Sequence, residues 1–255
     1  MSKKKKYSVD IIRNNFYKKK NFNLYYLMEK RFQWMNKFII NNKIKGLEVG
    51  TGADFAKAFI KNKNLKTSDF ENWKHLDFKK IDAHKTTFKN HSFDFIIAAN
   101  MLHHLKYPLI FLNEMHRILK KKGKLIMFEP NGSILLRIIL FITQHENFDK
   151  SIDIWNYKKP TKKSNNPWIG NNAIPDLIFE DKEKFNEYFG NQFKIIFHNK
   201  CEFLTFLNSG GVYFKSYYLP LNRFFCDLIW CCDVTLTKLF PSIFALGNKI
   251  VLKKL

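Results

Sequence analysis

The chain has 255 residues, which is long enough for one sizeable domain with a complete hydrophobic core. Hydrophobic residues make up 45% of it and charged residues 26%, so the composition excludes an intrinsically disordered chain. The 44 Lys and Arg residues against 22 Asp and Glu give a formal net charge of +22. The lysines are scattered, from KKKK at 3–6 to KKK at 120–122, and no arginine cluster joins them. We therefore expect a solvated basic surface in preference to a nucleic-acid footprint.

The cysteines and the N-terminus indicate a reducing, cytoplasmic location. Cys201, Cys226, Cys231 and Cys232 form no CxxC pair, so no metal site and no disulfide scaffold is predicted. The N-terminal MSKKKKYSVD lacks the apolar run of a signal peptide. The most apolar stretches, SILLRIILFI and FFCDLIWCCDVTLTKLF, contain charged residues and are too short to cross a membrane. We therefore expect no transmembrane segment, although a peripheral membrane contact stays open.

Residues 1–43 are predicted to form an N-terminal helical lead-in. Apolar side chains recur there at helical spacing, at Tyr26, Met28, Phe32, Met35 and Phe38. One or two helices should therefore cover one side of the core.

Strand and helix patterns alternate between residues 44 and 130. The predicted strands are KIKGLEV (43–49), LKTSD (65–69), HLDFKKID (75–82), FDFIIAAN (93–100) and KLIMFEP (124–130). The predicted helices are DFAKAFIKN (54–62) and YPLIFLNEMHRILKK (107–121), the second of which should end at Gly123. Short apolar strands separated by helices predict an α/β fold, with a Rossmann-like doubly wound sheet, mostly parallel, and helices on both faces.

Residues 131–255 are predicted to supply a lid or acceptor-binding segment and the final strands of the same domain. Between 131 and 185 the periodic pattern is lost, and irregular segments of this length are usually functional or disordered. Late strands are predicted within 193–207 and 245–255, with the last strand antiparallel. The helix expected at 221–240 carries Phe224, Phe225, Leu228, Ile229, Cys232 and Leu236 at helical spacing. This spacing favours burial in the core over an interfacial surface that meets lipid.

A glycine turn follows the first predicted strand, in the stretch KGLEVGTGADFAKAFI (45–60). Gly50 and Gly52 let the backbone approach a ligand closely. The sequence departs from the dinucleotide pattern G-x-G-x-x-G, because Phe55 occupies the third glycine position. Glu48 and Asp54 would also repel a diphosphate, whereas they would attract a cation. The turn therefore favours a ligand with an ammonium and a sulfonium group over NAD.

Several motifs in order resemble one family. LEVGTGAD resembles motif I of the class I S-adenosylmethionine-dependent methyltransferases, an acidic residue followed by x-G-x-G. IDAHKTTFKNHSFDFIIAANMLHHL and FLNEMHRILKKKGKLIMFEP resemble later segments of this family, nearest its ubiquinone/menaquinone-biosynthesis-like (type 11) group. The resemblance covers residues 44–130 and implies a Rossmann-like core there that binds S-adenosyl-L-methionine.

The resemblance also implies which residues bind this cofactor. Asp69 occupies the position of the family's acid that hydrogen-bonds the ribose hydroxyls, and Glu71 is an alternative for this role. Asp82 occupies the position that usually contacts the adenine amino group. The implied cofactor-binding residues are Glu48, Gly50, Thr51, Gly52, Asp69, Asp82, Ala83 and Asn100. Two departures are that Asp54 replaces the third glycine of motif I and that Lys122-Gly123 replaces a Pro-Gly pair. Asp54 could also cap the following helix.

Candidate catalytic residues follow the two central strands, because ligands of such sheets bind past the carboxyl ends of the strands. His103 and His104 follow the strand 93–100, and Glu129 lies at the end of the strand 124–130. A histidine can serve as a general base near neutral pH. The alternatives are that one histidine packs beneath the cofactor and the other orients its loop, and that Glu129 shapes the site.

The sequence narrows the acceptor by what it lacks. The loop after 93–100 is AANMLHH, without the Pro-Pro-aromatic motif of adenine methylation, and no Pro-Cys nucleophile for cytosine methylation is present. We therefore expect a methyltransferase of a small-molecule, sugar or lipid-linked acceptor, with cell-surface glycan biosynthesis as a candidate setting. The alternatives are a basic RNA-binding protein or RNA methyltransferase on this fold, and a catalytically silent methyltransferase-like subunit.

Overall fold

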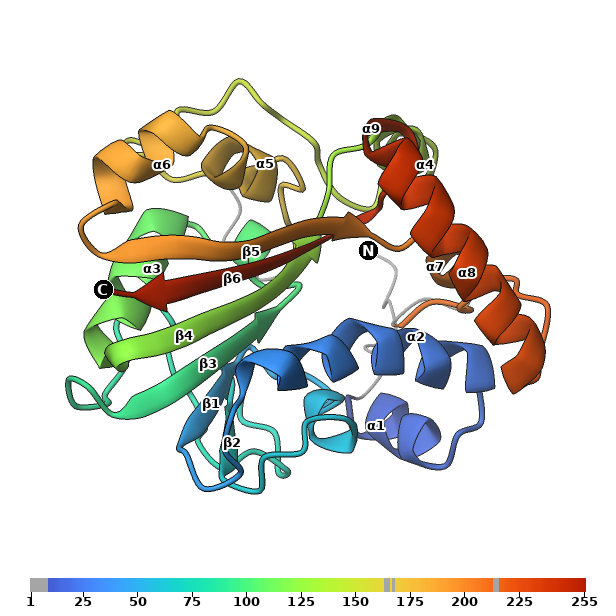
Figure 1. Cartoon of the computed structure of the whole chain (residues 1–255), viewed down its shortest axis with the longest axis horizontal. Helices are drawn as coiled ribbons and strands as arrows, with labels where there is room; N and C mark the ends of the chain where they lie inside the picture. The colour runs from blue at the N-terminus through green and yellow to red at the C-terminus, as the bar shows by residue number, and fades with distance from the viewer. Residues whose placement is uncertain (1–8, 163–165, 167, 213–215) are drawn as a thin grey trace, which may run out of the picture.

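A six-stranded sheet forms the centre of the computed structural model, which describes residues 9–162, 166, 168–212 and 216–255 (Figure 1). Its strands are β1 (Gly46–Val49), β2 (Leu65–Ser68), β3 (Phe93–Ala99), β4 (Leu119–Pro130), β5 (Phe193–Cys201) and β6 (Gly247–Lys254). They lie in the order β2-β1-β3-β4-β6-β5. The first four are parallel, and β6 runs antiparallel to both of its neighbours. The predicted mostly parallel sheet with an antiparallel last strand is confirmed. The lysine run at 3–6 lies outside the described residues.

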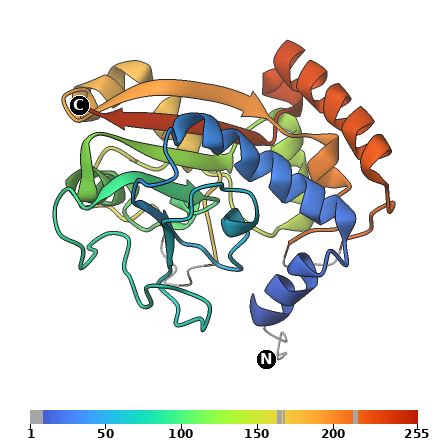
Figure 2. The same ribbon diagram turned by 60° about the horizontal axis from the view of Figure 1, so that its bottom comes forward.

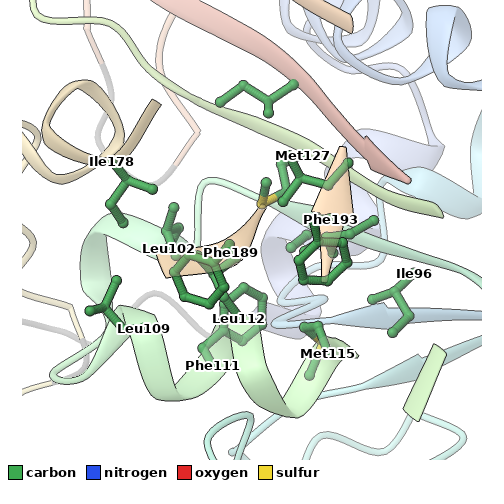
Figure 3. Packing of buried hydrophobic residues seen from close by; sticks show 14 of the residues in the cluster. Ile96, Leu102, Leu109, Phe111, Leu112, Met115, Met127, Ile178, Phe189 and Phe193 are labelled. Atoms are coloured by element: carbon green, nitrogen blue, oxygen red, sulfur yellow. The ribbon is translucent and has the colours of Figure 1, made fainter. Parts of the chain in front are cut away.

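Helices cover both faces of this sheet, as predicted. Alternate residues of a strand point to opposite faces. Accordingly Ile96 belongs to the core cluster of α3 (Pro108–Ile118), α5 (Ile174–Phe179) and α6 (Lys182–Phe189), shown in Figure 3. The next residue, Ile97, belongs to the cluster of α1 (Val9–Tyr17), α2 (Phe22–Phe32) and η1 (Gln33–Phe38). Figure 2 shows α2 lying across the second face. From Val9 onward, the described part of the predicted lead-in is mostly helical.

The helix predicted at 54–62 is wrong, since only a single 3-10 turn, η2 (Ala56–Ala58), forms there. The side chain of Asn36 takes the backbone groups that a helix would need. Its Nδ2 donates to the carbonyl of Phe59 over 2.9 Å, and its Oδ1 accepts from the N–H of Lys61 over 2.9 Å. Such side-chain bonds compete with helical ones. The apolar residues of the stretch still pack against α1 and α2.

The strand predicted at 75–82 is also wrong. One isolated bridge joins Phe78 to Ser68, and the carboxylate of Asp77 accepts the N–H of Thr67 at 3.0 Å. A strand ladder beside β2 would need that N–H for itself. In addition, α3 ends at Ile118 and not at Gly123. Lys122 adopts a positive φ of 63° there, in an irregularity of the pairing between β3 and β4.

Four helices lie past the carboxyl ends of the parallel strands, at one side of the molecule in Figure 1. They are α4 (Ile134–Thr143), α7 (Leu204–Leu207), α8 (Arg223–Leu239) and α9 (Pro241–Phe244). The helix predicted at 221–240 is present as α8, but its predicted burial is wrong, because Phe224, Phe225 and Leu228 are exposed. The described part of the chain contains no helix with both the length and the apolar character that a membrane crossing needs.

Candidate active site

The glycine turn after β1 adopts the backbone conformation that its composition predicts. Gly50 has a φ of 67° and Gly52 has a φ of 55°. Residues with a side chain adopt such values only at a cost in free energy. A Cβ atom on Gly50 would lie 2.6 Å from Cγ of Met101, so this position also requires glycine for space. Asp54, which replaces the third glycine of the motif, shares the left-handed conformation with φ of 65°. Its backbone therefore explains why a glycine is usual there.

Two carboxylates beside this turn are buried, and each has an oxygen atom that accepts no hydrogen bond in the described structure. Glu48 is 3% exposed and Asp54 is 1% exposed. In the described structure Oε2 of Glu48 and Oδ1 of Asp54 have no hydrogen-bond partner. Burial, and secondarily the charge of Asp54, raises the pKa of Glu48 well above its usual range. Burial also raises the pKa of Asp54, against the opposing charges of Lys57 and Arg13. The turn thus presents unsatisfied acceptor atoms that a cation would stabilise.

Helix α1 holds the turn from one side. The guanidinium of Arg13 lies 3.2 Å from Oδ2 of Asp54, and the hydroxyl of Tyr17 donates to the Asp54 carbonyl over 2.7 Å. A ring nitrogen of His75 also lies 2.7 Å from the Gly52 carbonyl, and its other ring nitrogen lies 3.8 Å from Asp10 of α1. The sequence did not single out Arg13, Tyr17 or His75, because they lie outside the motif.

Asp69 lies directly against the glycine turn. Its Oδ2 accepts the N–H of Gly52 over 2.9 Å, and its Oδ1 accepts the N–H of Glu71 over 2.9 Å. Glu71, the alternative for the ribose-binding role, therefore holds the Asp69 carboxylate in place through its backbone N–H. Thr51 is buried, and its N–H donates to the Ser68 carbonyl over 3.1 Å, which fixes the turn to β2.

The other predicted cofactor-binding residues lie along the same edge of the sheet. The N–H of Ile81 donates to the Asp69 carbonyl over 2.9 Å, which brings the neighbouring Asp82 and the half-buried Ala83 close to β2. The side chain of Asp82 is 53% exposed and bonds to Nδ1 of His84 at 2.8 Å. Asn100 is exposed at the end of β3 and has φ of 52°. Its N–H donates to the Phe128 carbonyl over 2.7 Å.

The three predicted catalytic residues form a second group. His103 and Glu129 are buried, and Nδ1 of His103 lies 2.6 Å from Oε2 of Glu129. The other oxygen of Glu129 accepts the N–H groups of Met101 and Leu102 over 2.9 Å each. These bonds stabilise the first turn of η3 (Leu102–His104), which carries both histidines. The imidazole of His104 stacks on that of His103, with 4.1 Å between ring centroids.

Glu146 completes this second group, and the sequence did not predict it. Its carboxylate lies 3.7 Å from Nε2 of His103 and 3.4 Å from Nε2 of His104, and it accepts a hydrogen bond from Asn172. Burial, followed by the charges of His103 and Lys162, lowers the pKa of His104 well below its usual range. The only sequence signal for Glu146 is its place in the long irregular segment. No pattern in that segment marks one acid above another.

His103, His104 and Glu146 also offer one ligand atom each within 4.8 Å of one another, a spacing compatible with a metal ion. The ammonium of Lys162 interacts with both Glu146 and His104. A neighbouring ammonium disfavours a second cation at the same place. Lys162 therefore makes this group less suited to a metal ion.

Met101 connects the two groups. Its side chain lies against Gly50, and its N–H bonds to Glu129. The glycine turn after β1 and the histidines after β3 therefore lie on either side of one residue. A separate cavity of about 280 Å³ lies within the irregular segment and α5–α6, and is lined by residues such as Trp155, Asp176 and Glu180. None of the predicted site residues lines it.

Comparisons with known proteins agree with this geometry. The profile of a family described as "Methyltransferase domain" matches residues 42–127. Probable polyketide synthase 10 of Dictyostelium discoideum is 31% identical over 106 residues, which are 40% of this chain and 4% of that protein. An uncharacterized protein of Methanocaldococcus jannaschii is 38% identical over 71 residues, which are 28% of this chain and 31% of that protein. The chain thus matches less than a third of either relative.

A solved structure shares the fold. The YcgJ protein from Bacillus subtilis superposes with a TM-score of 0.50 at 12% identity, over 88% of this chain and 97% of that one. At this identity the likeness concerns the fold alone. The matched profile covers the glycine turn, Asp69, Asp82 and both histidines. The profile match supports a methyltransferase domain at residues 42–127, and S-adenosyl-L-methionine is the cofactor that this family implies.

Proposed function

We propose that this protein transfers a methyl group from S-adenosyl-L-methionine to a small-molecule, sugar or lipid-linked acceptor, in the cytoplasm. The observation that carries the proposal is the buried Glu48 carboxylate beside the glycine turn, with an oxygen atom that has no partner in the described structure. A buried, unpaired carboxylate is costly, and a cationic ligand would remove that cost. The donor is such a cation.

The residues of the turn fit this donor. Glu48 would hold its positively charged amino acid part, and the remaining lone pairs of Asp69 would accept the ribose hydroxyls. Asp82, Ala83 and Asn100 would line the adenine side, with Gly50, Thr51 and Gly52 forming the backbone cradle. When bound, the donor supplies a methyl group on a positively charged sulfur, which is already activated for displacement. The protein's task is then to align the acceptor and to remove its proton.

We assign the proton acceptor to His103, with Glu129 as its positioning residue. The Glu129 carboxylate favours the tautomer with the proton on Nδ1, since it lies 2.6 Å from that atom. The lone pair on Nε2 is then free to accept a proton from a hydroxyl or amine. Glu146, 3.7 Å from Nε2, is beyond hydrogen-bond distance and would stabilise the imidazolium that forms. His104 would pack against His103 and shape the same surface.

The irregular segment supports a closed acceptor site. A Cβ atom on Gly170 would lie 2.7 Å from Cδ2 of His103 and 3.0 Å from Nδ1 of His104, so this backbone lies against both rings. The N–H of Asn171 donates to the His103 carbonyl over 2.9 Å. We therefore propose that the described residues 145–146 and 168–172 form one wall of the acceptor site and limit the access of water to it.

Isothermal calorimetry with S-adenosylmethionine tests the proposal. The wild-type chain should bind the donor, and Glu48→Gln should weaken binding by about tenfold or more, as expected for loss of a charged partner. The matched control Glu183→Gln changes an exposed acid of α6 and should leave binding intact. Tritiated methyl groups should then pass to a polar-metabolite or lipid extract, with release of S-adenosylhomocysteine.

Two results would contradict this assignment. RNA affinity that survives Glu48→Gln, without donor binding, would indicate an RNA-binding protein. Donor binding without S-adenosylhomocysteine release in any extract would indicate a catalytically silent subunit.

A further inference from the structure

Helix α8 buries two polar side chains against the protein and leaves several large apolar side chains exposed to solvent. The buried residues of α8 are Cys226, Asp233 and Thr237. The carboxylate of Asp233 accepts the N–H groups of Phe203, Leu204 and Thr205, which lie at the start of α7. The outward face carries Phe224, Phe225, Leu228, Val234 and Leu239, each 48% exposed or more. This is the reverse of a helix that packs on a core.

Helix α4 extends the same apolar surface. Its sequence is ILLRIILFIT, and only Leu136 is buried. Phe141 is 81% exposed and Ile142 is 74% exposed. The short helix α9, with exposed Ile243, contacts both α4 and α8, so the three helices lie together on one side of the molecule (Figure 1). We call their exposed apolar residues the α4/α8/α9 face. Exposed apolar side chains gathered in this way mark an interaction site.

The charges of this face select its partner. Its helices carry the cations Arg137, Arg223 and Lys238. Of these, Arg223 pairs with Asp227 and Glu29, so the excess positive charge comes from Arg137 and Lys238. The acid Asp233 is buried, and Asp227 also accepts from Tyr26. The whole chain has a formal net charge of +22. Apolar helices flanked by cations, on a strongly basic protein, are complementary to a bilayer surface that contains anionic phospholipids.

The face adjoins the proposed active site. Helix α4 follows Glu129 in the chain and precedes Glu146, and both of these acids lie beside His103. We infer that the α4/α8/α9 face docks this protein on an anionic phospholipid bilayer, with α4 and α8 lying in the interface. An acceptor carried by a lipid would then reach the histidines from the membrane side. The inference rests on the proposed function only for this last step.

Vesicle flotation with the full chain tests the inference. The wild-type protein should float with vesicles of phosphatidylglycerol and phosphatidylcholine, and more weakly with phosphatidylcholine alone. The double variant Phe141→Asp/Phe224→Asp should lose at least about tenfold in vesicle affinity, because both side chains would otherwise enter the interface. The matched control Ile40→Asp replaces an apolar residue that is 86% exposed and lies outside this face, and it should bind as wild type does.

Three outcomes would overturn the inference. The first is that wild-type protein does not bind the vesicles. The second is that the double variant binds as wild type does, which would show that the dispersed lysines alone attract the protein to the vesicles. Analytical ultracentrifugation could also show a dimer that the double variant dissociates, so that a second copy covers the face. Donor binding, measured by calorimetry on the same variants, shows that they are folded. Vesicle binding without donor binding in the wild type would contradict the proposed function alone.

Discussion

Nδ1 of His103 lies 2.6 Å from Oε2 of Glu129, and both side chains are buried. The same carboxylate accepts backbone N–H groups of the turn that carries the histidine. Glu129 therefore fixes both the position of the imidazole and the nitrogen that holds its proton. This arrangement distinguishes His103 from His104, whose ring has no carboxylate on Nδ1 in the described structure.

The first prediction concerns this pair. His103→Gln should lower kcat by about 10²–10⁴, the usual contribution of a general base, without changing donor affinity. Glu129→Gln should lower kcat less, because an amide can still accept the backbone N–H groups, and should leave the KM for the donor unchanged. Single-turnover kinetics with labelled donor would measure both effects. His116→Gln, in α3, is the control, and an equal loss in it would indicate general damage to the fold.

The second prediction concerns proton release on donor binding. Burial raises the pKa of Glu48, so the ligand-free site tends to hold a proton that the cationic donor must displace. Donor affinity should therefore rise with pH up to the raised pKa of Glu48 and level off above it. Calorimetry in buffers of different ionisation enthalpy should detect this proton release at pH values below the raised pKa of Glu48. Glu48→Gln should abolish it, and an unchanged proton release in that variant would contradict the assignment.

Sequence motifs predicted the residues of the glycine turn because the relevant spacing is local. Glu48, Gly50 and Gly52 are neighbours in the chain, and Asp69 directly follows the adjacent strand β2. The helix at 54–62 failed for a tertiary reason, since Asn36 arrives from a distant segment to take its backbone groups. Glu146 could not be found for a similar reason. Only the folded chain brings that acid to His103.

The orientation of α8 shows a different limit of sequence patterns. Periodicity identifies an apolar stripe on a helix, but it does not determine whether that stripe faces the protein or a partner. Here the backbone N–H groups before and within α7 need an acceptor, and Asp233 supplies it from the opposite side of α8. The stripe with Phe224 and Leu228 is then left outside. Burial was the wrong expectation because it ignored this polar anchor.

The third prediction concerns the backbone at Asp54. Its φ of 65° favours glycine, and a side chain with Cβ is strained there. Asp54→Gly and Asp54→Ala both remove the contact with Arg13, so they differ mainly in this strain. Asp54→Gly should be more stable than Asp54→Ala by about 1 kcal/mol in urea unfolding. Equal stabilities would show that the turn relaxes to another conformation.

The fourth prediction concerns the anchor of α8. Asp233→Ala should lower the free energy of unfolding by about 2 kcal/mol, because three backbone N–H groups at the start of α7 would lose their acceptor. Asp233→Asn should cost less, since its amide oxygen can still accept.

Burial raises the pKa of Asp233, against the N–H groups that bond to it, so its protonated form should be favoured as the pH falls. Because the folded state binds this proton more tightly than the unfolded chain does, the stability of wild type relative to Asp233→Asn should rise as the pH falls through the raised pKa. Urea titrations at several pH values would measure it, and Thr235→Ala, on the exposed side of α8, is the control. A stable Asp233→Ala variant that still floats with anionic vesicles would show that the orientation of α8 does not depend on this carboxylate.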